Sequence, residues 1–539
     1  MPVSPIRRRG LSTRAQRLMW DAHSATGVTL GLVLFVIFFS GAFALYRTQL
    51  DAYANVALRG PVALTTDEVV GPLFDETPPA LGSQVTVFYP FGERRSVFVR
   101  YTPEGEDVAV VQQVSVTTGE AFAFAEESRL SLILYQLHFL LQLRYVLPGH
   151  SLIGIAIAGL FAVFMLFGTV SGLLIHLKKL PREWHTFRAR GGLRTALSDA
   201  HTVLGLVGLP FAVMYSVTGG IIAIMIIFNA PITDHFFDGD RDAYDTATYG
   251  VGVPEADSTG QTAAMLLPDA LTAALPEGWR GVDPIRVVYR QWGDAGATAT
   301  IRGHIEETLT TSGRATLSAA TGDLIAHNPP TSPTALGATY AVTEQLHYGD
   351  VGGSVLDALF FVLALATSAV ILTGNVLWIV VRRPKNPNAT PRLHRLLARL
   401  TVGFGCGLVA AVPVLFIVAL LMPDGVDNLH VWEESLFFAA WGLLIGAALF
   451  GRSAAWAARW QLALAGVLCL AVPVANGFAT GAWPWVSVAM GWWSTLWIDV
   501  GFVLGALLLF AIAARLPTTP EPTQVALDPE PTAEPALSL

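Results

Sequence analysis

Eight long apolar runs dominate the chain and alternate with polar segments of very unequal length. Each run is long enough to cross the hydrocarbon core of a bilayer as a helix, which takes about 20 residues. The first run is longer than a signal-peptide core and no small-residue cleavage site follows it, so we expect a retained helix. The pattern therefore predicts a mainly α, polytopic membrane protein with eight transmembrane helices, at about 24–46, 150–177, 201–228, 354–381, 398–422, 431–451, 461–480 and 492–514.

The two long polar segments, 47–148 and 229–353, carry the alternating pattern of half-buried strands. In both, a Thr-Gly-acid triplet separates two alternating runs, at 118–120 and 321–323, which indicates a hairpin turn. A probable helix over 262–275 precedes the second set of strands. We therefore expect two small α+β domains, each with one helix on a short antiparallel sheet.

The first 381 residues read as two copies of one unit. Residues 21–41 and 199–219 both open with Asp-Ala-His, place a glycine four residues after the histidine and close with Ser-Gly or Thr-Gly. Each polar segment then ends in Gln-Leu-His, at 136–138 and 345–347, before the next apolar run. Parallel repeats of this kind are related by an axis along the membrane normal.

Charge sets the expected orientation. The composition is 53% apolar and 14% charged, with a formal net charge of −8 and a mean hydropathy of +0.52. Basic residues gather before the first run, between the second and third, and after the fourth, as in Arg7, Arg8, Arg9, Lys178, Lys179, Arg382 and Arg383. By the positive-inside rule these segments and both termini are cytoplasmic. The long polar segments are then periplasmic and the membrane is the bacterial inner membrane.

These boundaries divide the chain into seven parts. A disordered cytoplasmic tail is expected after the last helix, because it is rich in Pro, Thr, Glu and Ala. The expected parts are the N-terminus with helix 1 (1–46), the first periplasmic domain (47–148), helices 2 and 3 with a basic loop (149–228), the second periplasmic domain (229–353), helix 4 (354–381), a basic loop with helices 5–8 (382–515) and the tail (516–539).

Five histidines lie at the ends of the apolar runs. The repeat relates His23 to His201 at the inner ends and His138 to His347 at the outer ends. His176, at the inner end of the second run, has no histidine counterpart. Ionisable side chains are rare in membrane segments and often functional, although a single histidine at a helix end is more often an interfacial residue.

Two facing imidazoles from different helices are what a b-type haem requires. The only cysteines, Cys406 and Cys469, lie inside apolar runs and form no C-x-x-C-H motif, so any haem is held without covalent bonds. The Ser/Thr-Gly pairs, together with Gly27 and Gly205, remove side-chain bulk and make room for a flat macrocycle or for close helix packing. Asp21 and Asp199 are close enough in sequence to orient the imidazoles.

The histidine-bearing motifs resemble those of the PepSY-associated transmembrane-helix family, iron-regulated inner-membrane proteins that include siderophore-iron reductases. The resemblance covers roughly residues 15–385, and the two outer domains resemble PepSY modules. It rests on Leu137-His138, Ser171 to His176, Lys178, Phe187, Arg190, Asp199 to His201, Gly205, Leu209 to Phe211 and Thr218-Gly219.

The resemblance implies a ferric-chelate reductase, an oxidoreductase that passes electrons outward to a ferric siderophore or other Fe(III) chelate. It implies haem b, two per chain, or one if the three inner histidines form no usable pair. A separate donor, either quinol or a cytoplasmic reductase, is expected because no G-x-G-x-x-G motif follows a strand. No nucleic-acid partner is expected. The implied haem and iron ligands are His23, His138, His176, His201 and His347.

Two other functions fit the same pattern. PepSY-like modules anchored by the helices would bind or regulate periplasmic partners without catalysis. A transporter for an iron chelate is the third reading, although the repeats share one orientation and no broken helix pair carries charges at mid-depth. The four helices after residue 398 go beyond the family's basic form, and the sequence assigns them no role.

Overall fold

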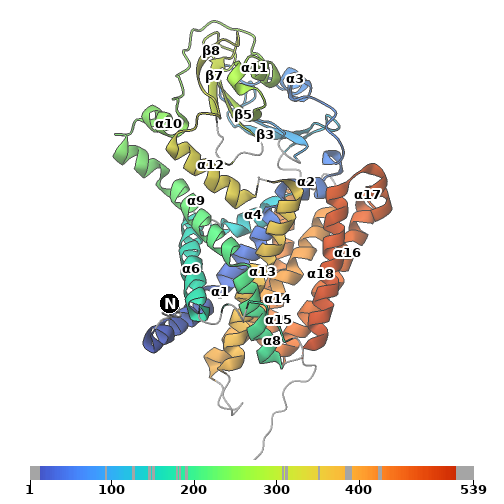
Figure 1. The fold of residues 1–539 in the computed structure, drawn as a ribbon. Coiled ribbons are helices and arrows are strands. Elements are labelled where there is room, and N and C mark those ends of the chain that lie inside the picture. The colour runs from blue at the N-terminus through green and yellow to red at the C-terminus, as the bar shows by residue number, and fades with distance from the viewer. Residues whose placement is uncertain are drawn as a thin grey trace, which may run out of the picture.

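Eight helices in the structure are long and apolar enough to cross a membrane (Figure 1). The computed structural model describes residues 12–90, 94–123, 128–143, 147, 152–177, 180, 184–188, 192–305, 309, 313–349, 352–382, 391–422, 426 and 428–516. The eight spans confirm the expectation of a polytopic membrane protein. They are α1 (Thr13–Ala44), α6 (Ile153–His176), α9 (Leu209–Phe236), α13 (Gly353–Val381), α14 (Arg392–Leu421), α15 (Leu429–Phe450), α16 (Ala454–Thr480) and α18 (Trp493–Arg515).

Some expectations fall outside these residues. They are the disordered tail beyond residue 516 and part of the basic segments, namely Arg7, Arg8, Arg9, Lys178, Lys179, Arg190 and Arg383.

The third span differs from the sequence prediction, because the expected helix over 201–228 is broken in two. The chain forms α8 (Leu193–Val207), turns at Gly208 and continues as α9. Pro210 lies in the first turn of α9, where its missing N–H costs nothing, whereas inside a continuous helix it would remove a hydrogen bond. The first copy of the repeat has Leu32 at this place and stays helical throughout α1. His201 therefore belongs to α8, a helix separate from the third span.

The two outer segments build one sheet, which corrects the expectation of two separate sheets. Its order is β4-β3-β2-β1-β5-β6-β7-β8. Each segment supplies four strands, and the first strand of each, β1 and β5, pair antiparallel at the centre. The strands are β1 (Val85–Phe88), β2 (Ser96–Tyr101), β3 (Val110–Ser115), β4 (Ala121–Ala123), β5 (Asp283–Arg290), β6 (Thr298–His304), β7 (Gly313–Ser318) and β8 (Leu324–Asn328).

Edge pairing explains the joined sheet. If the two four-stranded units were separate, β1 and β5 would each be an exposed apolar edge strand. Pairing β1 with β5 provides hydrogen-bond partners for the backbone N–H and C=O groups of both edges. Val87 lies opposite Val287 at the centre, and both are fully buried. The two expected turns are confirmed, because Gly119 and Gly322 have φ values of +78° and +79° and follow β3 and β7 at the same position. The strand order is therefore symmetric about the β1–β5 contact.

One face of the sheet is covered by α3 (Thr66–Glu76) and α11 (Pro268–Ala273), the latter a shorter form of the helix expected over 262–275. The second residue of each helix is an aspartate that caps the other helix: the Asp67 carboxylate accepts from the backbone N–H of Asp269 at 2.7 Å, and the Asp269 carboxylate accepts from the backbone N–H of Asp67 at 2.9 Å. This exchange joins the two halves a second time. Short helices complete the outer region: α2 (Arg47–Ala54), η1 (Val56–Leu58), α10 (Arg241–Tyr249), η2 (Glu277–Trp279) and α17 (Pro484–Met490).

The Gln-Leu-His segments end short helices of their own, α4 (Leu130–His138) and α12 (Ala335–Tyr348). They are not the outer ends of the second and fourth spans, as the sequence suggested. Gly349 ends α12 in the left-handed conformation, with φ +76°, and Gly352 and Gly353 also have positive φ. These glycines let the chain change direction before α13, so the outer histidines lie on helices distinct from the spans.

The last four spans form a bundle around α14, whose Leu408 and Phe416 are fully buried. A buried polar network connects this bundle to the segment after α1. The Tyr53 hydroxyl donates to Asp499 at 2.6 Å, and the Asn476 amide donates to the same carboxylate at 3.1 Å. The Arg59 guanidinium donates to Asn476 at 3.2 Å. Since all four side chains are almost fully buried, the extra bundle is firmly attached to the repeated part of the chain.

Candidate functional site

The inner pair of histidines is brought together by the fold. His23 on α1 and His201 on α8 lie next to each other in an edge arrangement, with ring centroids 6.1 Å apart and an interplanar angle of 69°. The Nδ1 atom of His23 lies 2.9 Å from the carbonyl oxygen of Gly168 on α6. The Nδ1 atom of His201 lies 2.9 Å from the carbonyl oxygen of Val370 on α13. The two rings are thus held by equivalent positions of the two repeats.

The outer pair has the same construction. His138 on α4 and His347 on α12 have ring centroids 6.0 Å apart, with planes at 35°. The Nδ1 atom of His138 lies 2.8 Å from the carbonyl oxygen of Ile37 on α1. The Nδ1 atom of His347 lies 2.9 Å from the hydroxyl of Thr218 on α9. Each pair therefore combines one ring from each repeat.

Each of the four rings packs on a glycine. A Cβ added at Gly41 would lie 2.6 Å from the His138 ring and one at Gly374 would lie 2.8 Å from the His201 ring; for Gly172 and His23, and for Gly219 and His347, the distances are 3.2 and 3.3 Å. These are the glycines of the Ser/Thr-Gly pairs, and any side chain would push the imidazole away. The glycines four residues after His23 and His201 do not serve close helix packing. Among the described residues, a Cβ at Gly27 meets nothing within 4 Å, and one at Gly205 meets Val370 at an ordinary 3.7 Å.

The hydrogen bonds determine the tautomer of all four imidazoles. A carbonyl oxygen only accepts, so Nδ1 donates in His23, His138 and His201. The hydroxyl of Thr218 already donates to the carbonyl of Met214 at 2.8 Å, so it accepts from His347. Each neutral ring therefore carries its proton on Nδ1 and a lone pair on Nε2, which is the arrangement of a metal-binding imidazole oriented by a backbone acceptor.

The ring separations fit an iron between two imidazoles. With iron–nitrogen bonds of about 2 Å, as for other imidazole–metal bonds, facing ring centroids lie about 6 Å apart. Both pairs have this separation, with Nδ1 already occupied by the protein. Within the described residues, no group of three or more His, Cys, Asp or Glu side chains forms a metal site. The donor set thus suits a group that brings its own equatorial ligands, as haem does.

The sequence left open which inner histidines pair, and the structure brings together His23 and His201. His176 lies close enough to interact electrostatically with both rings. Its counterpart Trp378 stacks on His394 with ring centroids 6.0 Å apart, so the inner end of the second repeat is filled differently. His176 is a neighbour of the pair and not one of its two facing rings.

Asp199 does not orient His201, contrary to the sequence expectation. Its carboxylate accepts from the guanidinium of Arg188 at 2.8 and 2.9 Å, and from the backbone N–H of the same residue at 2.9 Å. The aspartate therefore ties the loop before α8 to that helix. The orienting partners of the imidazoles are backbone carbonyls and Thr218, which no spacing rule identifies. Asp21, the equivalent residue of the first repeat, is likewise not the partner of the His23 Nδ1 atom, which contacts Gly168 and Ser171.

A pocket with a volume of about 80 Å³ lies beside the outer pair. His138 and His347 line it together with aromatic and aliphatic side chains from α1, α4, α6, α9, α12 and α13. Phe38, Phe161 and Met165 are among them. The space next to the outer imidazoles is thus small, partly open and lined mainly by apolar side chains from helices of both repeats.

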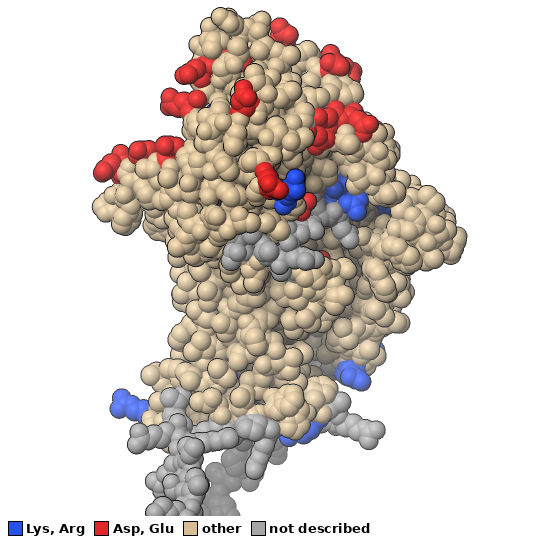
Figure 2. All heavy atoms as spheres, turned by 45° about the horizontal axis from the view of Figure 1, so that its top comes forward, with Lys and Arg blue, Asp and Glu red and all other residues tan. Residues whose placement is uncertain are grey.

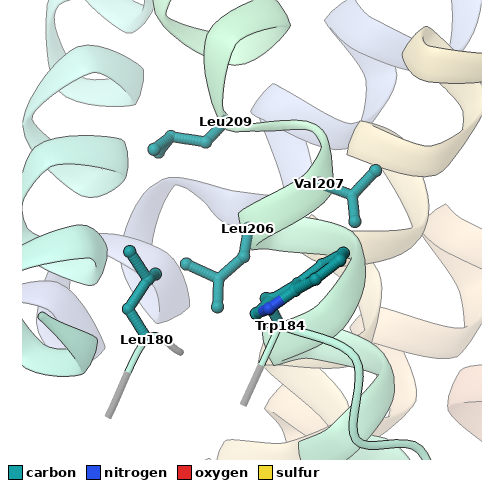
Figure 3. A pocket seen from close by; sticks show the side chains of 5 residues that line it. All are labelled: Leu180, Trp184, Leu206, Val207 and Leu209. Atoms are coloured by element: carbon teal, nitrogen blue, oxygen red, sulfur yellow. The ribbon is translucent and has the colours of Figure 1, made fainter. Parts of the chain in front are cut away.

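A second, more open groove lies at the break between α8 and α9 (Figure 3). It is lined by Leu180, Trp184, Leu206, Val207 and Leu209. The lining is apolar throughout, apart from the indole N–H, and suits contact with hydrocarbon chains. The groove borders the helix that carries His201.

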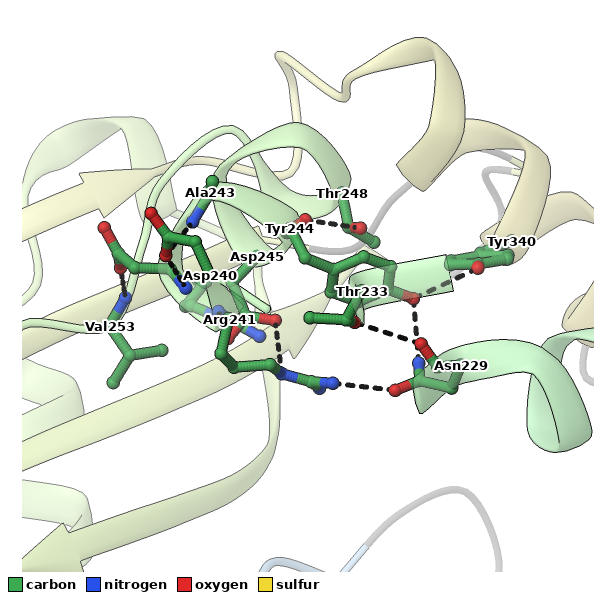
Figure 4. Close-up of polar contacts among 12 residues, drawn as sticks. Asn229, Thr233, Asp240, Arg241, Ala243, Tyr244, Asp245, Thr248, Val253 and Tyr340 are labelled. Carbon is green, nitrogen blue, oxygen red and sulfur yellow. Dashed lines mark hydrogen bonds and ion pairs between the residues drawn. The ribbon is translucent and has the colours of Figure 1, made fainter. Parts of the chain in front are cut away.

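Hydrogen bonds anchor α12, the helix of His347, to the outer end of α9 (Figure 4). The Asn229 amide donates to the Tyr244 hydroxyl at 2.8 Å, which contacts the Tyr340 hydroxyl on α12 at 3.2 Å. The guanidinium of Arg241 donates to Asn229 at 2.7 Å. These contacts hold α12 against the outer end of α9 and so help to position His347.

Comparison with known families agrees with this architecture. A model of the family described as the PepSY-associated TM region matches residues 20–380, the part that contains both repeats and all four facing histidines. The chain belongs to this family. The match ends at the last turn of α13, so the four-helix bundle α14–α18 is an addition to the part that the family shares.

An uncharacterized protein of Pseudomonas aeruginosa, PA4219, is similar to the chain. The two are 27% identical over 340 residues, which is 61% of this chain and 82% of the other protein. The similarity thus extends over most of the length of PA4219.

Proposed function

We propose that the protein is a b-type haem protein of the bacterial inner membrane that passes electrons outward and reduces periplasmic Fe(III) chelates for iron acquisition. The observation that carries the proposal is the doubled pair of facing histidines. Four rings on four different helices share one tautomer, one glycine support and a separation that suits iron. An interfacial role for a histidine requires none of these features.

The residues divide the work of binding. His23 and His201 would hold one haem, and His138 and His347 the other. The carbonyl oxygens of Gly168, Val370 and Ile37 and the hydroxyl of Thr218 keep each imidazole in the ligating tautomer. When bound, haem supplies a one-electron carrier at each end of the helix bundle.

The charge distribution supports the proposed orientation. Acidic side chains gather over the sheet and its flanking helices, and on the visible face the far end of the bundle shows basic side chains without acidic ones; a few basic side chains also lie just beneath the sheet (Figure 2). With the basic end in the cytoplasm, the sheet lies in the periplasm and the His138–His347 pair faces it. The donor at the inner pair is then a membrane quinol or a cytoplasmic reductase.

Replacing the pairs separately tests the proposal. His138→Ala with His347→Ala should remove about half of the bound haem, and His23→Ala with His201→Ala the other half. His235→Ala, in the exposed end of α9, is the matched control and should leave haem content unchanged. Haem is quantified as the pyridine haemochrome of detergent-purified protein. An unchanged spectrum in both double variants would contradict the proposal.

A further inference from the structure

A row of arginines crosses the second half of the sheet on the face opposite α3 and α11. Arg286 on β5 lies directly opposite Arg302 on β6, which lies directly opposite Arg314 on β7. Arg290 lies four residues after Arg286 on β5, so its side chain projects from the same face of the sheet. Like charges placed opposite each other across a sheet are destabilising, so the row requires compensation.

The fold itself does not require these arginines. The first half of the sheet has the same geometry, and its equivalent row reads Thr86, Arg100 and Val111. The equivalence follows from the turns, because Val111 and Arg314 both stand eight residues before the turn glycine, Gly119 or Gly322. The first half of the sheet therefore forms with one basic residue in this row, whereas the second half has three.

Two acids compensate only part of the row. Asp245 on α10 lies 3.1 Å from Arg314 but is shared with Arg241 at 3.5 Å. Glu344 on α12 lies 3.4 Å from Arg302. Arg314 is 7% exposed and also stacks on the ring of Tyr249, with its guanidinium 3.8 Å from the ring centroid. Arg314, at this end of the row, is therefore held by contacts within the protein.

Arg286 and Arg290 are different. In the part of the chain that the structure describes, neither has an ion pair with an acid, and the Nη1 atom of Arg290 is buried without a hydrogen-bond partner. Burial, followed by the charges of Arg302 and Arg314, lowers the pKa of Arg286. Both side chains are partly buried, and the acids that act on them, Glu344 and Asp245, are ion-paired with the neighbouring arginines. An anion bound here would complete the partly desolvated guanidinium groups.

The row lies beside the outer histidine. Glu344, the partner of Arg302, precedes His347 by three residues on α12, so the two side chains lie about one helical turn apart. In Figure 1, α12 lies between the sheet and the membrane helices and α10 lies beside the sheet; the ion pairs to Arg302 and Arg314 show that the arginine face is turned toward these two helices. A molecule bound to Arg286 and Arg302 would thus lie close to the outer imidazoles.

We propose that Arg286, Arg290 and Arg302 form the binding site for an anionic Fe(III) chelate, one that keeps free carboxylate or other oxyanion groups after it has bound the metal. The inference rests on the proposed function and names the substrate class of that site. Guanidinium groups recognise carboxylates by paired, charge-assisted hydrogen bonds, which favours anionic chelates over neutral or cationic hydroxamates. The half-exposed Arg302, with 25% of its side chain accessible, forms the open side of the site.

Binding of a redox-inert Ga(III) chelate tests the site without electron transfer. Full-length protein in detergent is titrated calorimetrically with Ga(III)–citrate, with citrate alone and with a cationic Ga(III)–trihydroxamate. We expect Ga(III)–citrate to bind more tightly than the other two, with an affinity that falls as salt is raised. Citrate alone binding equally well would reveal a general anion site and overturn the assignment, as would a preference for the cationic chelate.

Variants locate the binding. Arg286→Gln and Arg290→Gln should each weaken Ga(III)–citrate binding about tenfold, the loss expected for one charge-assisted contact. Arg280→Gln is the matched control, since Arg280 is 81% exposed and pairs with Glu277 elsewhere on the outer domain. Unchanged affinity in both site variants would overturn the proposal. Haem content of the same samples separates the two claims, because a haem-free protein that still binds Ga(III)–citrate contradicts only the reductase.

Discussion

At the scale of residues, the unit of the site is a histidine whose ring rests on a glycine and whose Nδ1 atom donates a hydrogen bond to a neighbouring helix. The unit occurs four times, at His23, His138, His201 and His347. A glycine is needed because the ring occupies the space where a Cβ would be. The residue before the glycine also contacts the ring in two of the four cases. The Thr218 hydroxyl accepts a hydrogen bond from His347, and the Ser171 hydroxyl lies 3.2 Å from Nδ1 of His23.

A methyl group at Gly41 should displace one imidazole. The added Cβ of Gly41→Ala would lie 2.6 Å from Nδ1 of His138, so the ring must move and its bond to Ile37 breaks. We expect the haem content to fall by about half, although alanine favours the helix by about 1 kcal/mol. Gly220→Ala is the control, since a Cβ there meets no described atom within 4 Å. Equal haem content in both variants would show that the glycine support is irrelevant.

Asp294 gives the outer domain a pH-dependent loop. Its carboxylate accepts from the backbone N–H groups of Gly296, Thr259 and Gly260, which lowers its pKa to about 2. Because the folded-state pKa is below the ordinary value of 3.8, the stabilisation is present at neutral pH and is lost as the pH falls from about 4 to about 2. The protection factors of the amides of residues 257–262, which compare their exchange rates with those of an unstructured peptide at the same pH, should therefore fall in that range. In Asp294→Asn they should already be low at pH 7, and protection factors that do not change with pH in the unaltered protein would contradict this account.

At the scale of elements, the sequence predicted the membrane helices well and the short helices poorly. Apolar runs of more than 20 residues determine a span almost by themselves. The break at Gly208 and the separate helices α4 and α12 depend on single glycines and a proline within apolar surroundings, which a hydropathy pattern does not detect. The strands and both Thr-Gly turns were predictable, because they follow from alternation and local turn chemistry. The joining of β1 to β5 was not, since it is a contact between segments about 200 residues apart.

The same contrast applies to the site. The repeat predicted the outer histidine pair and offered His23 with His201 as an inner pair, because equivalent residues in a twofold arrangement lie at equal depth, but it left His176 as a third inner candidate. It did not predict their partners, since carbonyl groups carry no sequence signal. Asp199, which the spacing favoured as an orienting residue, binds Arg188 instead. Arg286, Arg302 and Arg314 are unremarkable in sequence and form a row only through the strand register.

A residue of the added bundle holds the helix of His138. Glu433 on α15 is fully buried and accepts from the Ser128 hydroxyl at 2.6 Å and from the backbone N–H of Arg129 at 2.8 Å, at the start of α4. Glu433→Ala should leave these donors unpaired and destabilise α4 by about 1–3 kcal/mol. Hydrogen exchange of α4 amides should rise accordingly. Glu433→Gln, which keeps one acceptor, should have a smaller effect, and equal exchange in all three proteins would refute the capping role.

At the scale of the whole molecule, three layers follow one another from the outer sheet to the inner helix ends. The sheet joins both repeats through β1 and β5, and beneath it α4 and α12 bring the outer histidines together. Beneath these, α1 and α8 bring the inner histidines together, and α14–α18 support one side. In the proposed function, the pair of imidazoles at each end of the helix bundle serves electron transfer across the membrane, and the arginine row near the outer pair binds an anionic acceptor.

The central claim is that both histidine pairs bind haem. The direct measurement is the dithionite-reduced minus oxidised absorption spectrum of the purified full-length protein, with the haem quantified as pyridine haemochrome. The account predicts a b-type α band and about two haems per chain, one for each pair of facing imidazoles. A folded protein without a Soret band, produced with an adequate haem supply, would contradict it and leave the four histidines as packing residues.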